Sequence, residues 1–353
     1  SWCHAEVYAA ARSKPAFRQG GFFGARGTPA TWPAQNVSAP TAAIDRFFRA
    51  RETPAPWRIQ NVSAPWTQIG HASKAKVVYR ARVDDTKVIV KQSRKSGDGG
   101  GTTVYMELVY LESLRGRPGV PELLGAWWEA SRLTYATVDG GEPMSGIDEV
   151  PLRKPGARRF ATWAQKRPLQ LARSLLACFW SWASAGWFLD DFKDDQFTIT
   201  KDGDVYLVDG PRALATSPVG RAAVREWSRV SQLQDDSVVK CARDADCPRT
   251  HYSHSCSHPD HICEPGSVGA PEARGKCLAG TCMRLSEKTH VFDVANRPWL
   301  LPGIAARADD PASKTFLRGL IRLASAEAPE DRPSFAELLD RLDQFEKSHR
   351  RRA

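Results

Sequence analysis

The feature that most constrains this chain is a short acidic run in its middle, followed by a further carboxylate after one hairpin. Residues 189–197 read LDDFKDDQF, and residues 205–210 read VYLVDG. Phosphoryl transfer from ATP requires a carboxylate that orients the acceptor hydroxyl, a cation beside the migrating phosphoryl group, and a carboxylate that holds a metal ion against the phosphates. Asp191, Lys193 and Asp209 can fill these roles in chain order.

The same run resembles the catalytic loop of protein kinases, written H-R-D-L-K-P-x-N. Asp191 aligns with the catalytic Asp, Lys193 with the loop Lys, and Gln196 with the Asn that binds a metal ion. Asp209 aligns with the Asp of D-F-G, after a hairpin whose turn is expected at residues 201–204. The alternative for so short a motif is a polar hairpin with solvated charges.

Three further segments match the kinase pattern in the right order. Residues 86–91, TKVIVK, alternate like a strand that ends in Lys91, and residues 105–111 have helical spacing that would turn Glu107 toward it. That ion pair would hold Lys91 on the α- and β-phosphates of ATP. Residues 329–339, PEDRPSFAELL, resemble the last helix of a kinase large lobe. Each segment alone could be a surface feature, but their order favours the kinase fold.

The segment before this strand should cover the nucleotide phosphates. Residues 69–79 align with G-x-G-x-x-G-x-V, which predicts that Gly70 and Val77 contact the nucleotide together with Lys91 and Glu107. Alanines at positions 72 and 75 replace the other two glycines. Because glycine lets backbone amides approach phosphate oxygens closely, alanine should loosen or reshape this cradle.

The sequence therefore predicts an α+β, two-lobed, protein-kinase-like fold. Paired strands are expected at 120–128 and 133–138, a hinge that meets adenine at 139–142, and a buried helix from Pro168 to Trp187. The predicted divisions are a Pro/Ala-rich, largely disordered arm at 1–65, a small lobe at 66–138, a large lobe at 139–347 and a basic tail at 348–353. The arm contains the segment QNVSAP twice, at a period of 25.

Departures from the kinase pattern affect regulation and metal binding. Leu189 and Asp190 replace the His and Arg of H-R-D, and Gly210 follows Asp209 where D-F-G has Phe. Switching by phosphorylation of an activation loop therefore has no support in the sequence. Gln196 keeps an amide oxygen for a metal ion but is longer than Asn by one methylene.

A cysteine-rich insert takes the place of an ordinary activation segment. It spans residues 241–282 and contains Cys241, Cys247, Cys256, Cys263, Cys277 and Cys282. An even number of cysteines in a small, loop-rich unit favours a framework of three disulfides, whose connectivity the spacing does not fix. Zinc is the alternative, because histidines lie nearby, but no C-x-x-C pair is present. The remaining cysteines are Cys3 and Cys178, of which Cys178 is expected to be a buried thiol.

Together, the segment 191–197, the Val-Asp pair at 208–209 and the C-x5-C start of the insert at 241–247 resemble the divergent protein kinase (DIPK) family. The resemblance covers residues 66–345 and implies a cysteine-rich, kinase-like protein of the endoplasmic reticulum, typically anchored by an N-terminal membrane segment. Disulfides also indicate an oxidising compartment, so the endoplasmic reticulum, the Golgi lumen or secretion is expected. Sequons at Asn36 and Asn61 agree with a glycoprotein. No apolar stretch long enough to span a bilayer appears, so an anchor is possible but not present in this chain.

The sequence leaves two functions open. In the first, the chain is a kinase that uses ATP and Mg²⁺ or Mn²⁺, with Asp209 and Gln196 as metal ligands, and transfers the γ-phosphate to an unknown hydroxyl of a secretory protein or glycan. In the second, it is a pseudokinase that binds partners through the insert. The retained charged residues favour the enzyme, while the missing glycines favour the scaffold. The net charge of +10 is spread widely, and no basic stripe interleaved with aromatic residues indicates nucleic-acid binding.

Overall fold

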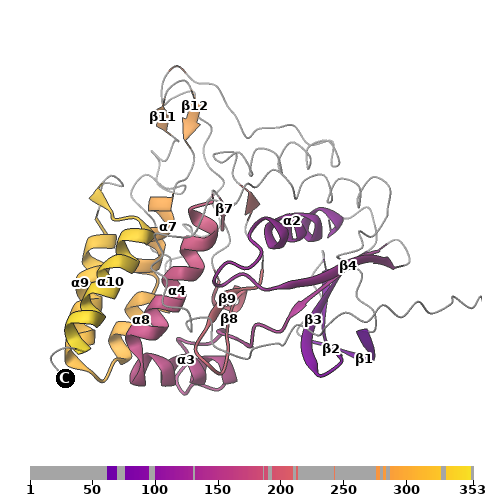
Figure 1. Ribbon diagram of the computed structural model, residues 1–353, viewed down its shortest axis with the longest axis horizontal. Coiled ribbons are helices and arrows are strands. Elements are labelled where there is room, and N and C mark those ends of the chain that lie inside the picture. The colour runs from indigo at the N-terminus through magenta and orange to yellow at the C-terminus, as the bar shows by residue number, and fades with distance from the viewer. Residues whose placement is uncertain are drawn as a thin grey trace, which may run out of the picture.

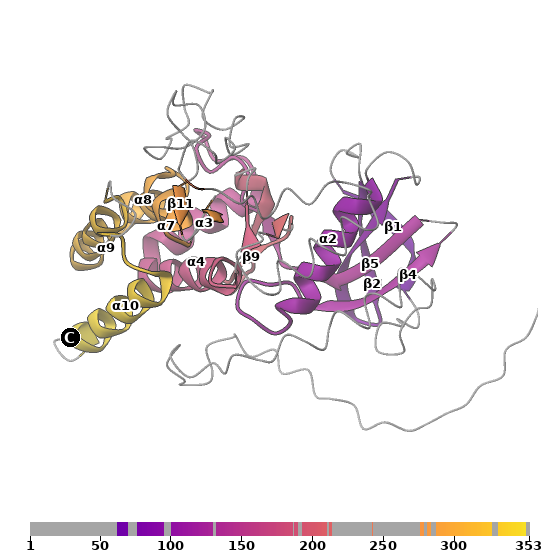
Figure 2. The same cartoon turned by 90° about the horizontal axis from the view of Figure 1, so that it is seen from above.

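The chain is a mixed α+β protein in which an antiparallel sheet precedes a group of helices (Figure 1). The computed structural model describes residues 62–69, 76–94, 100–129, 132–185, 187–189, 193–209, 212–213, 242, 276–278, 281–283, 287–326 and 331–350. The sheet and helix α2 lie at one side of the molecule, and α3, α4 and α7 to α10 lie at the other (Figure 2).

The main sheet has five antiparallel strands in the order β1-β2-β3-β5-β4. Its strands are β1 (Val62–Gln68), β2 (Lys76–Val83), β3 (Thr86–Ser93), β4 (Leu123–Glu129) and β5 (Arg132–Val138). The strand predicted to end in Lys91 and the strands predicted at 120–128 and 133–138 are therefore confirmed as β3, β4 and β5, within a few residues at their ends.

Residues of β2 and β3 alternate between the two faces of the sheet, as side chains of a strand do. Ala81, Val88 and Val90 belong to a small apolar cluster on one face, against which Trp66 and Trp127 pack. Lys91 is paired with Val78 in the register of β2 and β3, so both residues project from the other face. This second face carries helix α2.

Strand β1 begins at Val62, inside the range assigned by sequence to the disordered arm. It is an edge strand that pairs with β2, its register shifts between Ser63 and Thr67, and Pro65 is exposed there. A proline is tolerated at such a position because an edge strand has unpaired backbone groups. The ordered sheet therefore begins before the boundary predicted at residue 66, because proline content does not distinguish an edge strand from a disordered arm. The arm's remaining residues, 1–61, lie outside the described part.

The helix predicted around Glu107 is α2 (Gly100–Ser113). Val104, Leu108 and Leu111 recur at helical spacing and are buried in the main hydrophobic core. The helix contacts β3, β4 and β5, so its apolar side rests on the sheet face from which Lys91 projects. This packing sets the distance between Glu107 and the strands.

The C-terminal part of the chain packs around α4. Its helices are α3 (Pro155–Lys166), α4 (Pro168–Ala183), α7 (Glu287–Asn296), α8 (Leu301–Arg307), α9 (Pro311–Ala324) and α10 (Phe335–Arg350). Helix α4 contacts α3, α7, α8, α9 and α10, and its buried residues lie around much of its circumference, as predicted. The predicted end at Trp187 was wrong: the helix stops at Ala183, and Trp187 starts strand β7 (Trp187–Phe188), which pairs with β10 (Arg212–Ala213).

The hairpin predicted between the two carboxylate segments is present. It consists of β8 (Phe197–Ile199) and β9 (Val205–Leu207), and β6 (Glu142–Pro143) pairs with the outer side of β8. Gly203 in the turn has a φ of +85°, and an added Cβ would lie 2.6 Å from the ring of Trp163 on α3. Glycine thus allows both the left-handed backbone and the close approach of the turn to α3.

Helix α10 begins with a capping box, as its sequence S-x-x-E suggests. The backbone N–H of Glu337 donates to Ser334 Oγ at 3.2 Å, and Glu337 Oε2 accepts from the Ser334 N–H at 2.6 Å. Before it, the buried Arg332 donates to the carbonyls of Ala326 and Lys288, which ties the start of α10 to α7. Helix α10 continues through Arg350, so it includes the first residues of the basic tail predicted at 348–353.

Of the insert predicted at 241–282, the described residues are Ala242 and the hairpin β11 (Lys276–Leu278) and β12 (Thr281–Met283). Cys277 lies directly opposite Cys282 in its register. The other cysteines and the histidines of the insert lie outside the described part. Cys178 is a buried free thiol, as predicted, and burial raises its pKa to about 12. Among the described residues no helix is long and apolar enough to cross a membrane.

Gly119 is expected to be intolerant of any side chain. It has a φ of +72°, and an added Cβ would lie 2.4 Å from the Cβ of Cys178 on α4. Its carbonyl accepts from the N–H of Leu207 at 2.9 Å, so the backbone there cannot withdraw without breaking the contact with β9. We expect Gly119→Ala to lower the free energy of unfolding by about 3 kcal/mol or more, from backbone strain and overpacking together, as measured by urea denaturation.

Gly116 provides the matched control for this substitution. Its φ is +77°, but no atom lies within 4 Å of the position that a Cβ would take. Gly116→Ala therefore carries the backbone strain without the clash and should cost only about 1 kcal/mol. Equal losses in the two variants would show that packing against α4 does not set the requirement for Gly119.

Candidate functional site

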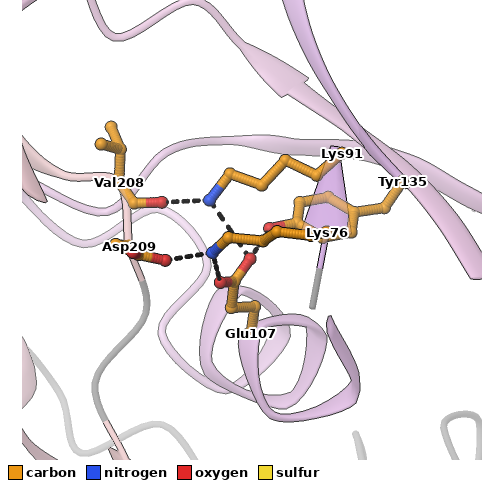
Figure 3. A network of polar contacts seen from close by, with 6 residues as sticks. All are labelled: Lys76, Lys91, Glu107, Tyr135, Val208 and Asp209. Carbon is orange, nitrogen blue, oxygen red and sulfur yellow. Dashed lines mark hydrogen bonds and ion pairs between the residues drawn. The ribbon is translucent and has the colours of Figure 1, made fainter. Parts of the chain in front are cut away.

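The candidate site is centred on the carboxylate of Glu107 in α2. Glu107 is only 2% exposed. Glu107 Oε2 accepts a hydrogen bond from Lys91 Nζ at 3.2 Å, and Oε1 is paired with Lys76 Nζ. The Tyr135 hydroxyl donates to Oε2 as well (Figure 3). Strands β2, β3 and β5 thus each supply one donor to a single buried carboxylate.

Lys91 lies where the sequence predicted it, and its contact with Glu107 is present. It lies opposite Tyr135 in the register of β3 and β5, so both side chains project toward α2. Its ammonium also donates to the carbonyl of Val208, the residue before Asp209. Burial lowers the pKa of Lys91, and the neighbouring charge of Lys76 adds to this effect, which Glu107 only partly offsets.

Lys76 is the site residue that the sequence reasoning missed. It is the first residue of β2, it is buried, and its ammonium pairs with both Glu107 and Asp209 (Figure 3). Burial disfavours its charge, but the two carboxylates outweigh burial and raise the pKa of Lys76 above its usual value. No sequence signal identified it, because only the pairing of Val78 with Lys91 shows that Lys76, two positions from Val78, lies on the same face as Lys91.

Asp209 follows β9, and its carboxylate lies at the outer end of this network. Its side chain retains 44% of its accessible surface, so it is the network member most open to a ligand. Burial by itself favours the neutral carboxyl, but the charges of Lys76 and Lys91 outweigh it and hold the pKa of Asp209 well below its usual range. Asp209 therefore remains a carboxylate at physiological pH.

Tyr135 completes the network as a neutral donor. The residue is 1% exposed, and burial together with the charge of Glu107 raises the pKa of its hydroxyl well above the usual value. Its proton therefore stays available for Glu107. The network holds two ammonium groups, from Lys76 and Lys91, and two carboxylates, from Glu107 and Asp209, so its formal charges balance.

Gln196 is the last residue of the short 3-10 helix η3 (Asp194–Gln196), and Lys193 directly precedes this helix. The Gln196 carbonyl accepts from the Val208 N–H at 2.9 Å, so this turn is next to the strand end that carries Asp209. Gln196 is buried, and its side-chain oxygen accepts from the Lys193 N–H at 3.3 Å. The side chain of Lys193 is exposed.

Val77 does not share the face of the two lysines. It pairs with Gln92, and alternation along β2 places it on the opposite face from Lys76 and Lys91. Val78 is instead the valine on the side of the site. A shift of one residue along a strand exchanges its two faces, so Val77 projects away from the two lysines. Its predicted contact with a nucleotide stays a prediction. Gly70 and Asp191, the other predicted site residues, lie outside the described part of the chain.

The segment predicted as an adenine-binding hinge is already hydrogen-bonded within the chain. The Gly141 N–H donates to Asp139 Oδ1 at 3.0 Å, and the Gly140 carbonyl accepts from Thr198 Oγ1 at 2.9 Å. Asp139 is also paired with Arg80 at 3.2 Å. These contacts fix the segment against β2 and β8, and a purine ring here would have to use its remaining backbone groups.

The donor set around Asp209 suits a hard divalent cation, which prefers oxygen ligands. A carboxylate that stays ionised and a glutamine amide oxygen from the adjacent turn are both of this kind. Among the described residues, however, no group of three or more His, Cys, Asp or Glu side chains is close enough to hold a metal ion by itself. Any such ion would therefore need ligands from a bound phosphate or from water, as Mg²⁺ commonly has.

No protein-family model matches the chain, and no curated protein is found to be similar to it.

Proposed function

We propose that this protein is an ATP-dependent phosphotransferase with a two-lobed, protein-kinase-like fold, which transfers the γ-phosphate of ATP to a hydroxyl group of a secretory protein or glycan. One observation carries the proposal. Lys91, Glu107 and the Val208–Asp209 segment are far apart in the sequence, yet they meet in one network through ion pairs and a lysine–carbonyl hydrogen bond. A protein kinase needs a strand lysine, its helix glutamate and a metal-binding aspartate together in this order.

The architecture agrees with this proposal. A five-stranded antiparallel sheet with a helix on one face precedes a mainly helical part built around a buried helix. In this proposal the sheet part is the small lobe, the helical part is the large lobe, and the insert follows Asp209. The sequence resemblance to the DIPK family supports the same assignment.

In this proposal each site residue has a separate role. Glu107 holds Lys91 in place, and Lys91 binds phosphate oxygens. Asp209 and Gln196 would hold Mg²⁺ or Mn²⁺, whose charge would neutralise the phosphates during transfer. Asp191 would orient the acceptor hydroxyl, and Lys193 would steady the γ-phosphate; Lys193 lies one turn from Gln196, while Asp191 lies outside the described residues.

A catalytically impaired pseudokinase is the second candidate, favoured by two observations. Lys76 is paired with Asp209, the carboxylate that a metal ion would use. The side-chain oxygen of Gln196 accepts from the Lys193 N–H. In this alternative the protein acts as a binding scaffold through its disulfide-rich insert.

The insert supports a secretory location for either candidate. Cys277 lies opposite Cys282 in the register of β11 and β12, and the six cysteines of this small, loop-rich unit favour a disulfide framework. Disulfides persist in oxidising compartments, so the proposed location is the endoplasmic reticulum, the Golgi lumen or the cell exterior.

Thermal denaturation with and without Mg-ATP and Mn-ATP tests for a nucleotide site. A ligand present at a hundred times its dissociation constant should stabilise the fold by about 2.7 kcal/mol, which shifts the melting temperature by several degrees. We expect this shift in the native chain and its loss in Asp209→Asn, because the amide cannot supply the charge for the metal ion. Asp202→Asn, an exposed change in the β8–β9 turn, serves as the control and should keep the shift. No shift with either metal in the native chain would contradict the enzyme and favour the scaffold.

A further inference from the structure

Two lysines project from one face of the sheet toward the same glutamate. In the register of β2 and β3, Lys91 lies opposite Val78 and Lys76 lies opposite Ser93, so the two lysines are diagonal neighbours on that face. Their ammonium groups pair with different oxygens of Glu107. Their second contacts differ: Lys91 donates to the backbone of Val208, whereas Lys76 pairs with the carboxylate of Asp209.

Stability of the fold does not explain the presence of Lys76. Glu107 already accepts from Lys91 and Tyr135, which give it one opposite charge and one neutral donor. Burying a further ammonium is costly, and apolar residues of similar size often replace buried charges without loss of stability. The lysine at the start of β2 therefore indicates a function that requires a positive charge beside Asp209.

The position of Lys76 identifies this task. Lys76 connects the buried glutamate to the one carboxylate of the network that remains accessible. If Asp209 held a metal ion on the nucleotide, the Lys76 ammonium, which pairs with Asp209, would be a cation available to the phosphate oxygens. In the sequence before β2, alanine stands at positions 72 and 75, where the kinase pattern has glycine, and glycine is the residue that lets backbone amides approach phosphates closely.

We propose that Lys76 is a second polyphosphate-binding residue, which acts beside Lys91 and supplies by its charge what the glycine-poor loop lacks. Lysine suits this role because its ammonium is a compact point charge on a flexible stem. On this view Lys76 neutralises Asp209 when no nucleotide is bound and turns to the phosphates when Mg-ATP arrives. The inference rests on the proposed nucleotide site but does not require that the protein be catalytically active.

The test compares the binding of Mg-ATP and of adenosine to the native chain, Lys76→Met and the control Lys87→Met, by titration calorimetry. Lys87 is an exposed lysine on β3 and lies on the same face of that strand as Lys91. We expect Lys76→Met to weaken Mg-ATP binding by roughly ten- to a hundredfold, the effect of one charge-assisted contact, and to leave adenosine binding unchanged. Lys87→Met should bind both ligands as the native chain does.

The outcomes separate this inference from the proposed function. If the native chain binds neither ligand, the nucleotide site itself is refuted, and the inference falls with it. If the native chain binds Mg-ATP and Lys76→Met binds it equally well, only the inference is refuted. An equal loss for Mg-ATP and adenosine would mean that Lys76 shapes the site without contacting phosphates, which also refutes it. If Lys76→Met does not fold, Lys76→Gln replaces it in the same binding comparison, because glutamine keeps a hydrogen-bond donor for the two carboxylates.

Discussion

Glu107→Gln is expected to lower the free energy of unfolding by about 3–5 kcal/mol, the typical cost of removing one partner of a buried ion pair. The change leaves two ammonium groups, from Lys76 and Lys91, close together in the protein interior. Lys76 would keep its pair with the carboxylate of Asp209, whereas Lys91 would keep neutral partners, the carbonyl of Val208 and the ring of Tyr135. Glutamine has nearly the same shape as glutamate, so the lost stability results from the change in charge and not from a change in volume. Urea denaturation measures this free energy of unfolding.

Glu112→Gln on the same helix is the matched control. Glu112 pairs with Arg115 at 2.6 Å, but this pair is near the surface, with side-chain exposures of 19% and 42%. Pairs of this kind contribute about 0–1 kcal/mol, so the control should stay close to the native stability. Adding Lys91→Met to Glu107→Gln should recover part of the loss, because it removes the uncompensated charge. Similar losses for the two glutamine variants would contradict the assignment of Glu107 as the centre of the network.

Unlike Glu107→Gln, Lys91→Met should change stability little but should greatly reduce the rate of ATP turnover. Removing one preorganised donor to a transition-state charge costs about 10²- to 10³-fold in rate. Stability should change by less than about 1 kcal/mol, because burial disfavours the Lys91 charge and methionine fills a similar volume. Phosphate release from ATP, followed with Mg²⁺ or Mn²⁺, gives the rate, and urea denaturation gives the stability.

Lys87→Met is again the control, since Lys87 is exposed on the same strand. It should keep both the native rate and the native stability. Native turnover in Lys91→Met would contradict the role of Lys91 and leave Lys76 as the remaining lysine of the network. No turnover in the native chain, together with a metal-dependent thermal shift, would favour the pseudokinase.

Much of the fold followed from local pattern. The alternation of residues 86–91 predicted β3, the helical spacing around Glu107 predicted α2, and the segment 329–339 predicted the last helix, α10. Local signals misled where tertiary contacts decided the outcome. The first residues of strand β1, up to Pro65, fall in the predicted arm, although an edge position accommodates proline. Helix α4 ends before Trp187. This tryptophan is buried, but it belongs to strand β7 and not to the helix.

The sequence by itself determined which residues could form the site and their order: a strand lysine, a helix glutamate and an aspartate after a hairpin. These are chemical identities and spacings, and they require no knowledge of packing. Only the tertiary structure decided that Lys76 joins them and that Val77 does not. The physical reason is that a strand changes face at every residue, so the pairing of β2 with β3, and not the motif, selects the side chains that point toward Glu107.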